Sequence, residues 1–152
     1  MLQEVLHIGL TVSDMDRSIN FYKNVLGLAF QGELLMEGEK TDRLFAGKSV
    51  RVRVAYLNGS ENIISPPIEL IQFLGEGAEE SGCDLHRVSI SEVCFRVADI
   101  DQVYESLKAQ GVECLSGPQD FDFTGYGFGK SRALYFKDPD GIILELMQPV
   151  GG

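Results

Sequence analysis

Cysteines and long apolar runs are scarce in this sequence, and each shortage argues against a class of protein. Cys83, Cys94 and Cys114 are an odd number without C-x-x-C spacing, which argues against a disulfide framework or a thiolate zinc site. No uninterrupted apolar stretch approaches the roughly 18 residues of a membrane-spanning helix, and the first residues lack a basic region followed by an apolar run. We therefore expect a cytoplasmic protein without membrane association.

Basic residues are also in short supply. The 13 Lys and Arg residues face 23 Asp and Glu residues, which gives a formal net charge of −10. A field of this sign repels phosphate backbones and anionic lipids, so a small molecule is a better expectation for the partner than a nucleic acid. At 152 residues the chain is long enough to bury the core of one ordinary domain.

The sequence does contain an internal repeat. LHIGLTVSDMDR, residues 6–17, aligns at an offset of 85 with SEVCFRVADIDQ, residues 91–102. Both copies alternate apolar and polar residues before acidic ones, which is typical of a strand that leads into a capped helix. The copies also end alike, because IELIQ at 68–72 matches LELMQ at 144–148 at an offset of 76. The smaller offset gives the first copy about nine extra residues, which we place in the loop from Asn58 to Pro67.

Helix and strand signals follow the same order in the two copies. In each, an apolar stripe at helical spacing ends at a glycine, Gly27 and then Gly111. Short runs typical of strands come next, at 28–35, 50–57 and 68–73 in the first copy and at 112–115, 132–137 and 142–148 in the second. Asp138 to Gly141 has the Pro and Gly placement of a tight turn, which predicts a hairpin between the last two strands.

These patterns predict an α+β fold of two tandem βαβββ modules that form a cupped mixed sheet. Module one covers residues 4–73, a linker covers 74–88 and module two covers 89–148. We expect the linker to be a hinge and not a domain boundary, so that residues 1–152 make a single domain.

Four polar residues occupy pseudo-equivalent positions in the repeat: His7, Glu69, Glu92 and Glu145. Alternate residues of a strand point to opposite faces, so His7 and Glu92 share the face that their apolar neighbours avoid. Glu69 and Glu145 stand between apolar residues, where a carboxylate is costly to bury unless it is paired, protonated or bound to a cation. One imidazole and three carboxylates predict a divalent-metal site that suits Mn²⁺, Mg²⁺, Fe²⁺ or Ni²⁺ better than Zn²⁺.

Several of these residues also have simpler interpretations. A lone histidine is more often part of the core or rim than a ligand, and the glutamates could form ion pairs with Arg51, Arg53 or Arg132. The segment GYGFG at 125–129 lacks the ending of a phosphate loop and is interpreted as a lid, with Phe128 beside an apolar pocket. Arg96 lies on the predicted ligand face, where it would receive a substrate carboxylate or neutralise the acidic site.

The stretches HIGLTVSDMDRSINFYKNVLGL and YFKDPDGIILELMQP resemble the vicinal oxygen chelate superfamily, whose members include glyoxalase I, methylmalonyl-CoA epimerase, extradiol dioxygenases and the fosfomycin- and bleomycin-resistance proteins. The similarity covers nearly the whole chain. It implies metal ligands at His7, Glu69, Glu92 and Glu145, with Glu145 as the leading catalytic base and Glu69 as its counterpart. Glu92 departs from the family's usual second histidine, which argues against the two-histidine iron site of a dioxygenase.

By this resemblance the chain is expected to be a metal-dependent lyase or isomerase of the glyoxalase type. Such an enzyme moves a proton next to a carbonyl of a small oxygen-chelating substrate. The alternative is a metal-free protein that binds a drug or metabolite, as bleomycin-resistance proteins do, and an extradiol dioxygenase ranks third. The enzyme is favoured because a binding protein needs no acidic cluster. We also expect a homodimer, which would bury sheet edges or complete the cavities.

Overall fold

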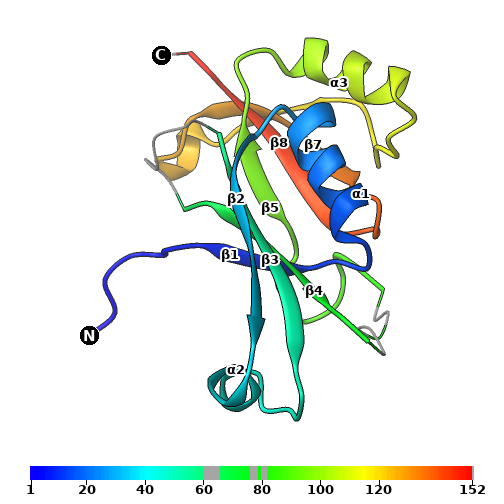
Figure 1. Cartoon of the computed structure of the whole chain (residues 1–152). Coiled ribbons are helices and arrows are strands. Elements are labelled where there is room, and N and C mark those ends of the chain that lie inside the picture. Colours follow the sequence, from blue (N-terminus) through cyan, green and yellow to red (C-terminus); the bar gives the residue numbers. More distant parts are fainter. Residues whose placement is uncertain (60–65, 76–78, 80–81, 152) are drawn as a thin grey trace. The chain divides into compact units, whose positions relative to one another are not determined.

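A computed structural model describes the chain except for residues 60–65, 76–78, 80–81 and 152. The chain divides into two compact units, residues 1–80 and 81–152, and each unit holds one four-stranded sheet (Figure 1). The division falls inside the segment predicted to be a linker, 74–88. The single domain over residues 1–152 stays a prediction.

The first unit is a mixed sheet in the order β1-β4-β3-β2, in which β1 is parallel to β4 and the other pairs are antiparallel. Its helices and strands in chain order are β1 (Ile8–Thr11), α1 (Met15–Asn20), the π-helical turn η1 (Phe21–Val25), β2 (Ala29–Glu37), α2 (Glu39–Leu44), β3 (Arg51–Asn58) and β4 (Ile68–Phe73). The π-helical turn η1 continues α1 and ends just before Gly27. The φ of 77° at Gly27 is the left-handed conformation that closes many helices.

The second unit repeats this topology in the order β5-β8-β7-β6, again with one parallel pair, β5 with β8. Its elements are β5 (Val93–Arg96), α3 (Ile100–Ala109), β6 (Gln119–Asp122), the 3-10 turn η2 (Thr124–Tyr126), β7 (Lys130–Lys137) and β8 (Ile143–Val150). The predicted α+β fold of two βαβββ modules is thus confirmed. Within the described ranges, no helix is both long enough and apolar enough to pass through a membrane.

Each main helix is fixed at its start by two matched polar contacts. Asp14 and Asp99 cap α1 and α3 by accepting a hydrogen bond from a backbone N–H of the first turn. A glutamine at the end of the closing strand, Gln72 or Gln148, accepts from the first N–H of the helix at 2.9 Å. Both contacts satisfy groups that a helix terminus leaves without partners, and the second ties helix to sheet.

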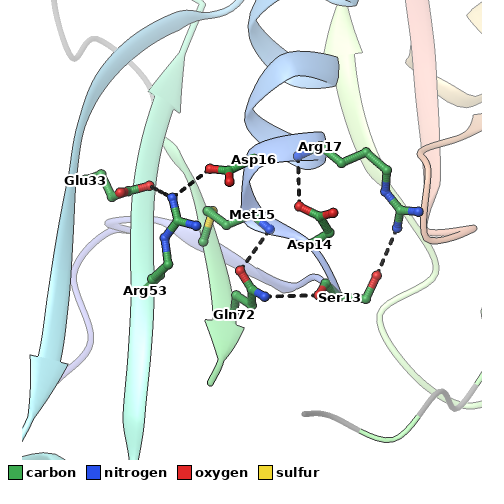
Figure 2. A network of polar contacts seen from close by, with 8 residues as sticks. All are labelled: Ser13, Asp14, Met15, Asp16, Arg17, Glu33, Arg53 and Gln72. Carbon is green, nitrogen blue, oxygen red and sulfur yellow. Dashed lines mark hydrogen bonds and ion pairs between the residues drawn. The ribbon is translucent and has the colours of Figure 1, made fainter. Parts of the chain in front are cut away.

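A matched arginine reinforces this helix–sheet contact in both units. Arg53 of β3 reaches Asp16 of α1 at 2.9 Å and Glu33 of β2 at 2.7 Å, as Figure 2 shows together with the capping contacts of the same helix. Arg132 of β7 contacts one aspartate of α3 and one of β6 in the same way. These arginines therefore mark the helix-covered face of each sheet.

Most of the buried apolar residues lie on that same face, although Val52 and Val54 are buried on the opposite one. Leu10 and Val12 of the first strand are 8% and 2% exposed, as the alternation predicts. Leu6, which continues the same alternation, is 72% exposed because it precedes β1. The first strand is therefore shorter than the sequence pattern.

The strand predicted at 112–115 is wrong. Cys114 makes only an isolated bridge with Phe136, and the edge strand of the second sheet is β6, at Gln119–Asp122. Gly117 and Pro118 separate the two segments. Because proline has no N–H to donate, a regular ladder resumes only after it.

The extra residues of the first copy are also placed differently from the prediction. Tyr56 and Tyr135 lie opposite Glu69 and Glu145 in matching register, which sets an offset of 79 for the third strands. The offset falls from 85 in the first strands to 79 in the third strands, so six of the extra residues lie between β1 and β3, in the segment that contains α2. It falls by three more, to 76, in the last strands. Only three fall between β3 and β4, and residues 60–65 of that loop lie outside the described residues.

The predicted turn between β7 and β8 is present, and it generates a test. Gly141 has a φ of 81°, and its N–H donates to the Asp138 carbonyl at 3.0 Å.

Gly141→Ala should lower the free energy of unfolding by about 1–2 kcal/mol, because side chains are strained in this region. The melting temperature should then fall by roughly 2–8 °C. Gly125→Ala is the control, since Gly125 has no positive φ and open space at its Cβ position; equal melting of the two variants would contradict the turn assignment.

Candidate functional site

A row of three residues crosses the face of the first sheet opposite α1. Gly9 of β1 pairs with Glu69 of β4, and Glu69 pairs with Tyr56 of β3, so all three project from one face. His7 lies two residues before Gly9, and its Nε2 is 3.6 Å from Glu69 Oε1. The Glu69 side chain is 13% exposed and that of His7 is 45% exposed. The sheet register thus brings the predicted His7 and Glu69 together.

Tyr56 is the direct partner of Glu69. Its hydroxyl donates to Glu69 Oε2 at 2.5 Å, and the hydrogen bond to this carboxylate, followed by desolvation, raises the pKa of Tyr56 to about 12. The phenol therefore stays protonated at neutral pH and remains a donor. The neighbouring Gly9 has no side chain, and a Cβ there would lie 3.6 Å from Glu69 Oε1. Tyr56 thus binds Oε2 of Glu69, and the strand position beside Oε1 carries no side chain.

The second sheet carries the equivalent row with different chemistry. Cys94 of β5 pairs with Glu145 of β8, which pairs with Tyr135 of β7. Glu145 is only 9% exposed. Burial raises its pKa and the negative charge of Glu92 adds to the effect, whereas the hydrogen bond from Cys94 opposes it. Glu145 is therefore a carboxylate whose proton affinity is increased, as a general base at neutral pH requires.

The Cys94 thiol is a hydrogen-bond donor to this carboxylate. Cys94 is exposed as a whole residue, yet partial desolvation of the thiol, the charge of Glu145 and the hydrogen bond to it raise the pKa of Cys94 to about 12. A thiol in this state is a poor nucleophile at neutral pH. Cys94 is therefore better suited to line the site than to act as a catalytic nucleophile.

The four predicted ligands are found as two pairs, one in each unit. His7 lies beside Glu69 on the first sheet, and Glu92 acts on Glu145 on the second. In the part of the chain that the structure describes, no three His, Cys, Asp or Glu side chains form a group able to hold a metal ion. A metal site built from all four residues stays a prediction.

The donor chemistry of the pairs fits a hard divalent cation. Glu69 has one oxygen facing an imidazole nitrogen, and Glu145 is a buried carboxylate that is disfavoured as an anion by its neighbour Glu92. A bound cation would stabilise the negative charge of a carboxylate ligand. Glu92 and Glu145, which are both acidic, would gain the positive partner that their pair lacks. The side chains present are therefore suitable ligands.

The alternative ion pairs for the glutamates are wrong. Arg51 contacts Glu37 at 2.9 Å on the first sheet. Arg53 and Arg132 contact acidic residues on the helix-covered faces, opposite the faces of Glu69 and Glu145. Among the described residues, the two glutamates thus have no arginine partner.

The predicted substrate-binding residues belong to the second unit. Arg96 of β5 lies two residues after Cys94, so it projects from the Glu145 face, and it is exposed. Phe128 is 72% exposed in the β6–β7 connection, where its N–H donates to the Phe123 carbonyl at 3.1 Å. Phe123 in turn stacks on Phe121 with ring centroids 5.6 Å apart. The lid and the substrate contacts stay predictions.

The sequence patterns missed the two tyrosines and the Cys94 contact. Tyr56 and Tyr135 repeat at an offset of 79, which matches neither of the offsets, 85 and 76, found at the ends of the copies. Aligning the third strands separately would have revealed them. The hydrogen bonds themselves depend on cross-strand register, which the sequence does not contain.

Comparison with known proteins gives one family model and several similar enzymes. A family model described as "Glyoxalase/Bleomycin resistance protein/Dioxygenase superfamily" matches residues 4–146. A "Probable lactoylglutathione lyase" of Vibrio cholerae is 30% identical over 146 residues, which are 95% of this chain and 89% of that protein. A "Metallothiol transferase FosB" of Staphylococcus epidermidis is 31% identical over 146 residues, 95% of this chain and 81% of that protein.

Two further similarities extend the comparison. A "2-epi-5-epi-valiolone epimerase" of an Actinomyces species is 27% identical over 155 residues, covering 97% of this chain and 80% of that protein. The crystal structure of a glyoxalase family protein from Bacillus cereus superposes with a TM-score of 0.84 at 24% identity, covering 99% of this chain and 97% of that one. At that identity the structural likeness establishes the fold alone.

The Cys94–Glu145 contact predicts the reactivity of the thiol. With a pKa of about 12, the thiolate fraction of Cys94 at pH 8 is about a thousandfold below that of an ordinary cysteine. Iodoacetamide should therefore label Cys94 slowly in metal-free protein, as measured by peptide mass spectrometry. Glu145→Gln removes the negative charge, lowers the pKa and should accelerate labelling. Cys83, whose raised pKa has no contribution from Glu145, is the internal control; an unchanged Cys94 rate in the variant would contradict the assigned contact.

Proposed function

Because this chain belongs to the Glyoxalase/Bleomycin resistance protein/Dioxygenase superfamily, we propose that it is a metal-dependent lyase or isomerase of the glyoxalase type. Its substrate would be a small molecule with two adjacent oxygens, and its reaction a proton transfer next to a carbonyl. The observation that carries this proposal is Glu145, a buried carboxylate whose pKa is raised while a thiol donor orients it. Such a group is suited to remove a proton from carbon.

The proposed ligands of a divalent cation are His7, Glu69, Glu92 and Glu145. When bound, the cation would act as a Lewis acid on the substrate oxygens. Mn²⁺, Mg²⁺, Fe²⁺ and Ni²⁺ are favoured over Zn²⁺, since three of the four ligands are carboxylates.

The other roles follow from the second sheet. Glu145 accepts the substrate proton and Cys94 holds the carboxylate by donating its thiol hydrogen. Arg96, on the same face, binds an anionic group of the substrate, and Phe128 contacts its apolar part. Glu69 is the pseudo-symmetric catalytic counterpart of Glu145 in the first unit.

The named relatives support an enzyme more than a passive binding protein. They include proteins named as a lyase, an epimerase and a transferase, and the name of the transferase refers to a metal. Their shared scaffold does not select one reaction, because the same fold hosts several chemistries. The substrate class in this proposal therefore comes from the resemblance to the family as a whole, and Glu145 supports the proton transfer.

We further propose a cytoplasmic homodimer. The three free cysteines agree with a reducing compartment. The edge strand β2 is nine residues long and exposes Phe30, Leu34 and Leu35 at 39%, 44% and 47%. Long apolar edges are usually covered by another chain. Light scattering should give about twice the 16.8 kDa chain mass, and a constant monomer mass across concentrations would contradict the dimer.

Proton exchange provides the direct test of the proposed reaction. In D₂O with Mn²⁺, the protein should exchange the hydrogen next to the carbonyl in some members of a panel of small 2-hydroxycarbonyl compounds, as followed by proton NMR. Chelation with EDTA should stop the exchange. Glu145→Gln should reduce it by about 10²-fold or more, because a positioned base contributes that much.

The matched control for that substitution is Glu105→Gln, which changes an exposed glutamate of α3. Its exchange rate should equal that of the unmodified protein. Tight binding of a panel compound without metal, without exchange and without dependence on Glu145 would contradict the enzyme and favour the metal-free binding protein.

A further inference from the structure

We infer that Tyr56 is a positioning residue for the first half of the site: its hydroxyl holds Glu69 so that only Oε1 is presented to a divalent cation. This inference rests on the proposed function, because it requires Glu69 to be a metal ligand. Nothing in the family resemblance assigned a role to Tyr56.

The geometry of the pair supports a fixed carboxylate. Tyr56 and Glu69 are direct partners in the antiparallel pair β3–β4, so their side chains leave neighbouring backbone positions on one face. The hydroxyl lies 2.5 Å from Glu69 Oε2, a distance typical of a hydrogen bond to a charged oxygen. The Tyr56 ring also contacts the His7 ring edge-on, with centroids 6.2 Å apart. One phenol thus touches both proposed ligands of the first unit.

The second oxygen of Glu69 is kept available. Its distance of 3.6 Å from His7 Nε2 is longer than a hydrogen bond. Among the described residues no hydrogen bond to Oε1 is found, and the adjacent strand position is Gly9, which has no side chain. A carboxylate with one oxygen bound and one free offers a single ligand atom in a defined orientation, as outer-shell partners of metal ligands commonly ensure.

The second unit provides a natural comparison. Tyr135 lies opposite Glu145 in the same register, but the donor to Glu145 is the Cys94 thiol. Within the described part of the chain, the Tyr135 hydroxyl makes no hydrogen bond. Gly9 occupies the position equivalent to Cys94 and cannot donate from a side chain. Tyr56 therefore supplies in the first unit the contact that the thiol supplies in the second.

Titration calorimetry with Mn²⁺ tests this role on the full-length chain. The set comprises the unmodified protein, Tyr56→Phe, Glu69→Gln, the double variant of both, and Tyr135→Phe as the matched control. Tyr56→Phe should weaken Mn²⁺ binding by roughly 10–100-fold, the usual effect of removing an outer-shell partner. Tyr135→Phe should change it by less than about threefold, since among the described residues that hydroxyl donates a hydrogen bond to none of the proposed ligands. In the Glu69→Gln background, Tyr56→Phe should have no further effect.

The melting temperature without metal separates positioning from plain stability. Tyr56→Phe should stay folded and melt only a few degrees below Tyr135→Phe, roughly the effect of one lost hydrogen bond, because only Tyr56 donates to a glutamate. A Tyr56→Phe protein that fails to fold, or that weakens Mn²⁺ binding equally with and without Glu69, would give the hydroxyl a structural role and overturn the inference.

Failure of this inference is distinguishable from failure of the proposed function. Absence of Mn²⁺ binding in the unmodified protein would overturn both. Binding that Glu69→Gln weakens and Tyr56→Phe leaves unchanged would overturn the role of Tyr56 alone. Binding that Glu69→Gln leaves unchanged would remove Glu69 from the site, and the positioning role with it.

Discussion

The cost of holding a carboxylate inside an apolar strand governs the organisation of both sheets. Glu69 and Glu145 stand in the strand that lies between the first and third strands of each module, with apolar residues before and after them. An unpartnered carboxylate there would lose its hydration without compensation. Both neighbouring strands therefore contribute to its surroundings, and the residues they contribute decide what each glutamate is able to do.

The two units meet this requirement in different ways. In the first, a phenol binds one oxygen of Glu69, and glycine leaves the other side open. In the second, burial raises the pKa of Glu145, a hydrogen bond from the Cys94 thiol opposes this, and the charge of Glu92 adds to it. A duplicated backbone has thus acquired one carboxylate that is oriented and one whose affinity for protons is raised. This difference supports the positioning inferred for Glu69 and the additional role of base proposed for Glu145.

The opposite face of each sheet has changed far less between the copies. Both modules keep an aspartate cap, a glutamine from the closing strand and an arginine that joins helix to sheet. Figure 2 displays this set for the first unit. Such contacts are individually weak when exposed, but together they fix the helix on the sheet and so the register on which the site depends. Conserved scaffolding on one face leaves the other face free to vary.

The sequence by itself determined the repeat and the fold class and singled out four candidate ligand positions, because strand and helix periodicities are local properties of the chain. It placed an edge strand wrongly at 112–115 and assigned the extra residues mostly to the wrong connection, since edge strands and insertions follow from pairing partners and not from local pattern. Only the tertiary structure decided that Tyr56 binds Glu69 and that Cys94 binds Glu145. Those contacts join residues 13 and 51 positions apart, and cross-strand register makes them direct neighbours in the sheet.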